Sequence, residues 1–377
     1  MSNSVSAAAL RQELWAKELY KDVMDNLYFT ENGLMGEGSN NIVEVKPELS
    51  KEKGDTTTFG LTAKLTGAGV SGDDELEGNE EAINAYSESI ILGQKRFAVR
   101  LTGRLDEQMN SYDMRKDAKE KLSIRMQEFI ERQVFLKLAG VGRADLVDVN
   151  GTVVSADYAW SNTPTIISAT DTAAGYGNRY LGADYTSGAT SLASTDLITP
   201  ELISRCRVKA TLASPKIQPL KINGRNYYVM FIHPWQAYDL KNNATFNQAR
   251  REAEVRGKEN PIFTGALGIW DGVIIHEHEY VPFLDISVNN AGTKVADFGS
   301  LTAGTEFAVD AFRAILCGRQ AVGFAQCKNP QGWVEETFDY KNKVGFATGI
   351  IGGIDKIMFN SKEYGCVALD TAATSLV

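Results

Sequence analysis

The sequence is poor in the residue types that most often carry chemistry. Its 377 residues include only three histidines, four cysteines and nine prolines. The cysteines contain no CxxC pair, so we expect small buried apolar residues in a reducing compartment rather than disulfides. They are Cys206, Cys317, Cys327 and Cys366. A chain of this length buries, on folding, roughly three quarters of the surface that it exposes when unfolded, so it needs no disulfide bonds for stability.

Long apolar runs and an excess of basic charge are also missing. Residues 1–10 lack a basic region and a secretory apolar stretch, and the run 344–354 is shorter than the roughly 20 residues that span a bilayer. We therefore expect a soluble protein made in a cytoplasm. The formal net charge of −9 argues against a protein that mainly grips nucleic acid or an anionic membrane.

Apolar periodicity predicts two strands joined by a long tip. Apolar residues alternate over 56–66 and again over 95–102, and the segment 67–93 between them is rich in glycine and acid. Two strands of this kind form a ribbon, which is marginal in water unless its apolar face is covered. The apolar face of the ribbon is therefore expected to pack either on the protein's own core or on a neighbouring subunit.

A long helix over 112–139 is the clearest single element. Ser111 is the cap candidate, Gly140 ends the pattern, and Met114 and Ala118 begin an apolar series that steps by four. About 27 residues at 1.5 Å rise give a rod of roughly 40 Å. Four-residue steps disfavour a coiled coil, so we expect an organising spine.

The rest of the chain predicts a mixed α+β fold. A helix is expected over 8–28, an irregular polar arm over 40–53, and a helix over 200–212 with Thr199 as its cap. Residues 150–199 have a weak pattern. Further strands are expected at 152–155, 165–167 and 227–232 and within 272–282, 307–316 and 334–358, with a helical turn at 235–240. Strands and helices interleave without regular βαβ units.

Two motifs resemble ligand sites but have simpler explanations. Residues 67–72 match G-x-G-x-x-G, yet Asp73 and Asp74 follow and would repel a pyrophosphate. Residues 276–279 read His-Glu-His-Glu, which offers two metal ligands on one strand face where a site needs a third. A serine–histidine–aspartate site using His233 or His276 could still form in space, although no nucleophile-elbow or Walker motif is present. We expect no cofactor, no metal and no catalytic residue.

Charge is segregated into blocks along the chain. Between Lys64 and Lys95 there are seven acids and no base, and from Lys95 to Arg143 there are twelve bases against seven acids. Between Glu201 and Asp239 there are six bases and no acid. Each block could be a solvated face, since an exposed pair contributes only about 0–1 kcal/mol. Opposite blocks nevertheless favour pairing within the fold or between copies.

Five segments carry a resemblance to a known family. They are LWAKELYKDVMDNLYF (14–29), KGDTTTFGLTAKLTGAGVSGDDELEGNEEAI (53–83), the long helix up to Gly140, IHPWQAYDL (232–240) and GWVEETFDYKNKVGFATGI (332–350). These segments resemble the major capsid proteins of tailed bacteriophages, of the coliphage N-four type. The resemblance extends over nearly the whole chain, least well over 150–199. It implies the Hong-Kong-97-type capsid fold.

The resemblance also implies a division of the chain and a function. The regions are an N-terminal arm (1–55), an extended β-ribbon loop (56–105), a peripheral domain (106–200) with a spine helix at 111–139, an axial domain (201–330), and C-terminal strands (331–377) returning to the peripheral and axial sheet. The function implied is self-assembly into hexamers and pentamers of an icosahedral head, a virion component assembled in the host cytoplasm. That head encloses double-stranded DNA without sequence-specific binding, and its expected partners are scaffolding and portal proteins, with or without decoration proteins. No membrane partner is expected.

Two surfaces are expected to join neighbouring subunits in such a shell. The extended loop is expected to contact its neighbour through Phe59, Leu61, Leu65, Asp73, Asp74, Glu75, Glu77, Phe97 and Val99. The candidate basic acceptor surface consists of Arg100, Arg104, Arg115, Lys116 and Lys119.

Two rival functions remain open from the sequence. One is an encapsulin-like cellular shell, which would contain a cargo enzyme rather than DNA. The other is a cytoplasmic hydrolase using His233 or His276, which substitution of both histidines would test.

Overall fold

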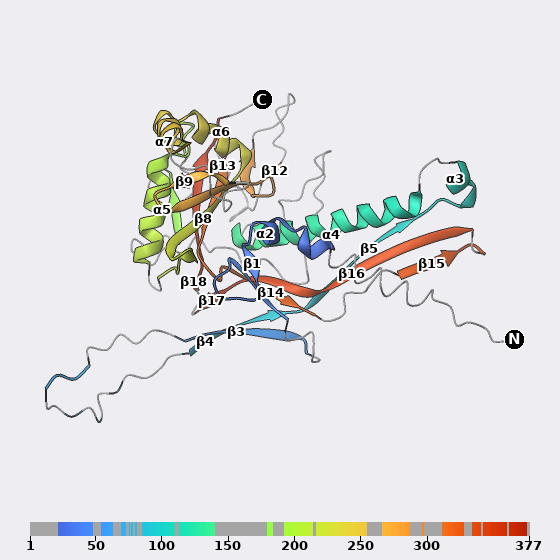
Figure 1. The fold of residues 1–377 in the computed structure, drawn as a ribbon, viewed down its shortest axis with the longest axis horizontal. Helices are drawn as coiled ribbons and strands as arrows, with labels where there is room; N and C mark the ends of the chain where they lie inside the picture. The colour runs from blue at the N-terminus through green and yellow to red at the C-terminus, as the bar shows by residue number, and fades with distance from the viewer. Residues whose placement is uncertain are drawn as a thin grey trace.

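The body of the protein consists of a lobe and an arm, and a narrow ribbon projects from their junction (Figure 1). The computed structural model describes residues 22–47, 54–62, 69–72, 75, 77, 80, 85–109, 113–139, 179–183, 192–213, 216–254, 266–286, 296–297, 311–327, 334–340, 342–359 and 362–374. Within these residues, no helix is both long and apolar enough to cross a membrane. The mixed α+β class expected from the sequence is confirmed.

The arm is a sheet covered by the long helix α4 (Met114–Ala139). Its central strand β16 (Lys343–Lys356) pairs antiparallel with β5 (Gly93–Arg100) along one edge. The other edge of β16 pairs with β15 (Val334–Phe338) and then β14 (Val322–Gln326). Strand β14 continues the sheet into β2 (Val43–Lys46) and β1 (Met35–Gly36), both added in parallel.

Helix α4 begins two residues later than expected, for a reason that the structure shows. The Asp113 carboxylate accepts hydrogen bonds from the backbone N–H groups of Arg115, at 3.0 Å, and Lys116, at 3.3 Å. This is the geometry of a helix N-cap, so Asp113 starts the helix in place of Ser111. A separate short helix, α3 (Arg104–Met109), precedes it and was not expected from the sequence.

The lobe is built on a second sheet with the described strand order β12-β11-β13-β8-β10-β9. These strands are β12 (Ala296–Asp297), β11 (Phe283–Ile286), β13 (Ala311–Cys317), β8 (Arg225–Ile232), β10 (Val273–Glu277) and β9 (Ala266–Trp270). β19 (Cys366–Ala372) pairs with β13 and carries β6 (Tyr180–Gly182), whereas β7 (Leu220–Ile222) pairs with β8. A small pair, β17 (Met358–Phe359) with β18 (Lys362–Glu363), lies between the two sheets in sequence.

Helix α5 (Pro200–Leu212) begins where the sequence signals place it, whereas α6 (Pro234–Asn242) is longer than expected and α7 (Ala244–Glu254) was not expected. In α5, the Thr199 hydroxyl accepts the Leu202 N–H at 3.4 Å and Pro200 occupies the first turn, as predicted. The turn expected at 235–240 is the full helix α6, which is followed by α7.

Arm and lobe meet at an aromatic cluster. Phe29 of α2 (Tyr28–Glu31), Phe135 of α4 and Phe231 of β8 have ring centroids 5.0–5.6 Å apart. All three side chains are buried, and full burial of such a side chain contributes about 1.5–3 kcal/mol. The cluster joins the N-terminal segment, the long helix and the lobe sheet into one core.

A buried arginine reinforces this junction. Arg313 of β13 donates to both carboxylate oxygens of Asp370 on β19, at 2.7 and 2.8 Å, and to the backbone oxygen of Ala139 at 3.1 Å. The Asp370 carboxylate raises the pKa of Arg313, so the guanidinium stays charged in spite of burial. The last carbonyls of α4 thereby gain a cationic partner inside the protein.

The N-terminal expectations need one correction. The helix expected over 8–28 lies mostly outside the described residues; helical residues 22–25 are followed by a break at Leu27, after which α2 begins. The arm expected to be irregular over 40–53 contains β2, in which Val43 and Val45 are buried. The strands expected at 152–155 and 165–167 lie outside the described residues.

Candidate assembly surfaces

The first ribbon strand, expected over 56–66, is confirmed as β3 (Thr56–Thr62), whereas the return strand differs from the one expected. β3 pairs antiparallel with β4 (Ala85–Ile91), in a register that places Phe59 opposite Glu88. The predicted return strand, 95–102, corresponds to β5 and pairs with β16 in the arm. The sequence pattern did not reveal β4 as a strand, because its inward positions, Tyr86, Glu88 and Ile90, include a carboxylate.

The root of the ribbon is anchored on its own subunit. Phe59 and Ile90 are buried against Ala325, Ile357 and Tyr364, and Leu61 packs beside them. Lys46 of β2 donates to the Thr58 backbone oxygen at 2.9 Å and lies over the Phe59 ring. The apolar face of the described ribbon therefore contacts the protein's own sheet, which was one of the two covers that the sequence left open.

Two glycines make this close approach possible. A Cβ at Gly323 of β14 would lie 2.7 Å from both the Phe59 and Ile90 side chains, and one at Gly353 of β16 would lie 2.5 Å from the Ile91 backbone oxygen. Real Cβ atoms do not tolerate such distances, so only glycine fits at these positions. The ribbon packs closely on the sheet because these two positions have no side chain.

Apart from Ile91, which is 49% exposed, the outward face of the described ribbon is made of small and hydroxylated side chains. Thr56, Thr58, Ala85, Ser87 and Ser89 are exposed and alternate with the buried residues along both strands. A face of this kind carries little bulk and offers hydroxyl groups as donors and acceptors.

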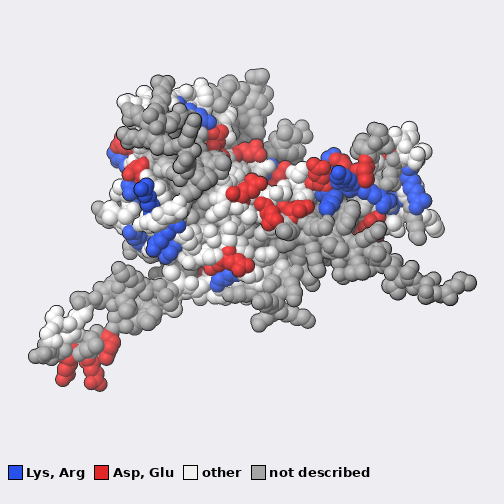
Figure 2. All heavy atoms as spheres, in the orientation of Figure 1, with Lys and Arg blue, Asp and Glu red and all other residues white. Residues whose placement is uncertain are grey.

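The tip beyond the ribbon is acidic. Glu75, Glu77 and Glu80 are exposed, and Figure 2 shows Asp and Glu side chains gathered at the ribbon's far end. Leu65, Asp73 and Asp74 lie outside the described residues. The tip's contact with a neighbour stays a prediction.

Phe97 and Val99 lie in the arm of their own subunit. Both pack against the main core, and the Phe97 ring lies 5.6 Å from the Phe129 ring of α4. The reason for assigning them to a subunit contact was their place in the ribbon, and β5 is not a ribbon strand. The structure thus separates them from Phe59 and Leu61.

The five residues of the candidate basic acceptor surface all lie toward the outer end of the arm. Arg100 ends β5 and lies over the Phe338 ring at 4.4 Å, Arg104 begins α3, and Arg115 forms a 3.4 Å ion pair with Glu335. Lys116 and Lys119 follow on the first turns of α4. Figure 2 shows Lys and Arg at this end of the molecule, interspersed with Asp and Glu, and the acidic tip at the opposite end.

The three histidines serve as structural groups. The Tyr28 hydroxyl and His276 Nδ1 are 2.7 Å apart, and the His278 ring stacks on Phe135. His233 caps α6 by accepting the Trp235 N–H. Burial lowers the pKa of each histidine to about 4, so all three are neutral near pH 7. No group of metal-ligating side chains is found among the described residues.

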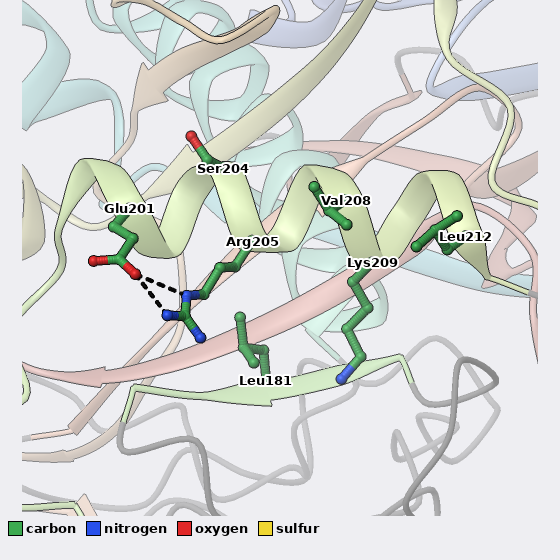
Figure 3. A pocket seen from close by; sticks show the side chains of 7 residues that line it. All are labelled: Leu181, Glu201, Ser204, Arg205, Val208, Lys209 and Leu212. Carbon is green, nitrogen blue, oxygen red and sulfur yellow. Dashed lines mark hydrogen bonds and ion pairs between the residues drawn. The ribbon is translucent and has the colours of Figure 1, made fainter.

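A hollow of about 570 Å³ lies beside α5 (Figure 3). Its polar groups are already engaged: Arg205 binds Glu201 at 2.6 and 3.1 Å, and Lys209 donates to the Tyr180 backbone oxygen at 2.5 Å. The remaining lining is mainly Leu181, Val208 and Leu212. This lining holds no nucleophile paired with a base.

Comparison with known proteins gives the class of the molecule. The chain matches the family described as Phage capsid protein over residues 3–375. It is 29% identical to the major capsid protein of Pseudomonas phage KPP25, over 96% of this chain and 95% of that one. It is similar to the capsid of Ralstonia phage GP4, with a TM-score of 0.75 and 28% identity over 93% of this chain and 92% of that one. The capsid of cyanophage Pam1 shares the fold, with a TM-score of 0.67 and 22% identity over 90% and 91%.

These matches and the lobe, arm and ribbon define a structural shell protein with the Hong-Kong-97-type capsid fold. The chain belongs to the phage capsid protein family. It is a major capsid protein, which forms the shell of the phage head and is a component of the virion. The resemblance drawn from the sequence is confirmed, and the encapsulin-like and hydrolase alternatives are not favoured.

Proposed function

We propose that the protein assembles head to tail into hexamers and pentamers, in which the ribbon tip of each subunit binds the outer arm of the next. Heterologous contacts of this kind close into rings when the rotation between neighbours permits. In this arrangement α4 is the spine of a peripheral domain, and the lobe is the axial domain at the ring centre. The proposed boundaries follow those expected from the sequence, 1–55, 56–105, 106–200, 201–330 and 331–377, except that β5 and β14 belong to the arm and β19 belongs to the lobe.

The observation that supports this proposal is the opposite charge at the two ends of the molecule. The exposed acids Glu75, Glu77 and Glu80 lie on the ribbon tip, whereas Arg100, Arg104 and the first turns of α4 carry bases on the arm. In one chain these ends point away from each other, so they suit a contact between two copies (Figures 1 and 2). Complementary charge favours correct register and suppresses wrong partners.

The head so formed is proposed to enclose double-stranded DNA without sequence-specific binding. The chain has a net charge of −9, so it is poorly suited to bind many DNA phosphates. A closed shell retains its DNA by enclosing it, without such contacts. Assembly in the host cytoplasm with scaffolding and portal proteins, with or without decoration proteins, belongs to the same proposal. The protein is proposed to have no catalytic activity, since its histidines are used as caps and packing groups.

A charge-exchange experiment tests the contact. Replacing Asp73, Asp74, Glu75 and Glu77 by lysine should abolish assembly while the single chain keeps its unfolding temperature, because the tip lies far from the core. Reversing Arg104 and Lys116 to glutamate in the same chain should restore shells, which negative-stain microscopy and sedimentation detect. The matched control replaces the same four acids by asparagine and glutamine. Wild-type assembly of the lysine variant would refute the tip contact.

A further inference from the structure

Two connections between the arm and the lobe run side by side. Residues 318–321 lead from β13 in the lobe to β14 in the arm, and residues 357–365 lead from β16 back to β19. The Gly318 N–H donates to the Gly365 backbone oxygen at 2.7 Å, and a Cβ at Gly365 would lie 2.4 Å from the Ala321 Cα. The angle between arm and lobe therefore depends on what holds these closely packed connections.

A buried ion pair lies at these connections. Lys356 is the last residue of β16, and Glu363 lies in β18, just before β19. Their side chains are 0% and 7% exposed, and Lys356 Nζ is 3.1 Å from a Glu363 carboxylate oxygen. The other carboxylate oxygen lies 3.6 Å from the Sγ of Cys366, the first residue of β19. The pair thus connects the end of the central arm strand to the start of a lobe strand.

The surroundings hold the pair in one geometry. Arg179, which is fully buried beside β6, donates from Nε to the Glu363 backbone oxygen at 3.0 Å. Burial alone would lower the pKa of Lys356, but Cys366 and Glu363 raise it above its usual value, so the ammonium group stays charged. Both partners are therefore fixed inside the protein, one from the arm and one from the lobe.

Stability alone does not account for a pair of this kind. Removing two charges from water costs about as much as their attraction returns, and apolar residues of similar volume often replace a buried pair without loss. Phe29, Phe135 and Phe231 already supply apolar burial at the junction, but apolar burial has no preferred direction. A charged, hydrogen-bonded pair forms in one geometry only, so it adds direction where the aromatic cluster does not.

A second directional contact joins arm and lobe at a separate point. Arg313 of β13 donates to the backbone oxygen of Ala139, the last residue of α4, at 3.1 Å. One such contact leaves the lobe able to pivot about it, whereas two at separate points fix the angle. We propose that the Lys356–Glu363 pair is a latch, which acts with the Arg313 contact to hold arm and lobe at one angle.

The effect of the latch extends to the shell, because every subunit repeats the same angle. A single angle gives identical chains one shape, and a spread of angles gives a spread of curvature and of shell diameter. The latch depends only on the shell-forming role of the chain and is independent of the proposed ribbon contact.

Lys356→Met with Glu363→Leu separates orientation from stability. This double variant removes both charges and keeps a similar side-chain volume, so the unfolding temperature of the single chain should stay the same or rise. Its arm and lobe should nevertheless adopt more than one angle. The matched control is Lys241→Met with Glu277→Leu, which removes a pair at 2.7 Å that lies within the lobe and should leave the angle unchanged.

Nitroxide labels report the angle in the unassembled chain. Lys121→Cys on α4 and Glu201→Cys on α5 place them at exposed positions of arm and lobe, and Cys327→Ser removes the one native thiol that is not buried. Pulsed electron–electron double resonance should give a narrow distance distribution with the latch present, and one at least twice as wide in the double variant. An unchanged width would overturn the proposal. A double variant that fails to fold would also overturn it, since the pair would then be needed for stability.

Negative-stain microscopy of the assembled protein distinguishes the latch from the ribbon contact. The double variant should form closed shells whose diameters vary at least twice as widely as those of the wild type. The lysine variant of the ribbon tip should form no shells. Shells of uniform wild-type diameter from the double variant would overturn the role of the latch in assembly.

Discussion

The protein should lose stability in acid because of His276, and the size of the loss follows from its surroundings. His276 is 3% exposed, hydrogen-bonds to the Tyr28 hydroxyl and lies beside the Phe231 ring. Burial lowers its pKa from 6.5 to about 4. The folded state therefore binds the proton less readily than the unfolded state does. Stability is fully present above pH 6.5 and falls as the pH drops toward 4.

The loss from His276 alone should be about 2 kcal/mol between pH 7 and pH 5, at about 1.4 kcal/mol per pH unit below 6.5. Glu131 acts in the opposite direction, because burial raises its pKa and its folded form gains stability as it takes up a proton. His278 adds to the loss, since its pKa is also lowered to about 4, by burial and by His276. The net slope should still favour loss in acid.

Urea unfolding of the unassembled chain at pH 7, 6 and 5 measures this effect. His276→Gln removes the titrating ring and should flatten the pH dependence by about 2 kcal/mol, although it lowers stability at pH 7 by removing packing. Tyr28→Phe is the matched control, because it removes the hydroxyl partner and leaves the imidazole buried. If His276→Gln and the wild type lose the same stability between pH 7 and pH 5, the reasoning about this histidine is wrong.

Two further predictions concern the junction and the ribbon root. Asp370→Asn should lower the free energy of unfolding by about 3–5 kcal/mol, because it leaves the Arg313 charge buried and unpaired, whereas replacing both residues by apolar ones should cost far less. Urea titrations of the single and double variants check this. Gly323→Ala should cost about 1–3 kcal/mol by forcing Phe59 and Ile90 apart, and limited proteolysis should then cut the ribbon faster than in the wild type. Equal proteolysis rates would contradict the seating described for the ribbon.

Local signals in the sequence were sufficient for α4 and α5, whereas α3 and α7 were not expected. Thr199 and Pro200 mark the start of α5 because a cap and a first-turn proline act within one turn of chain. At α4 the cap signal was ambiguous, because Ser111 and Asp113 are both residue types that cap helices. Only the backbone geometry shows that Asp113 is the cap. The apolar series through the helix nevertheless fixed its end and its buried face.

Strand partners could not be derived from the sequence, because pairing is settled by contacts far apart in the chain. The alternation in 95–102 correctly predicts a strand, yet that strand pairs with residues 345–352 rather than with 56–62. The true partner, 85–91, has Glu88 at an inward position, and burial beside Asp355 raises its pKa.

Strand β16 sets how the molecule can respond to changes of shape. Its 14 residues extend about 46 Å at about 3.3 Å per residue, and they pair with three other strands without a break. Because β16 belongs to the arm sheet alone, its continuity stiffens the arm along its length and leaves the junction with the lobe unaffected. A difference in curvature between rings that bends the arm would therefore be spread along β16 rather than concentrated at one residue.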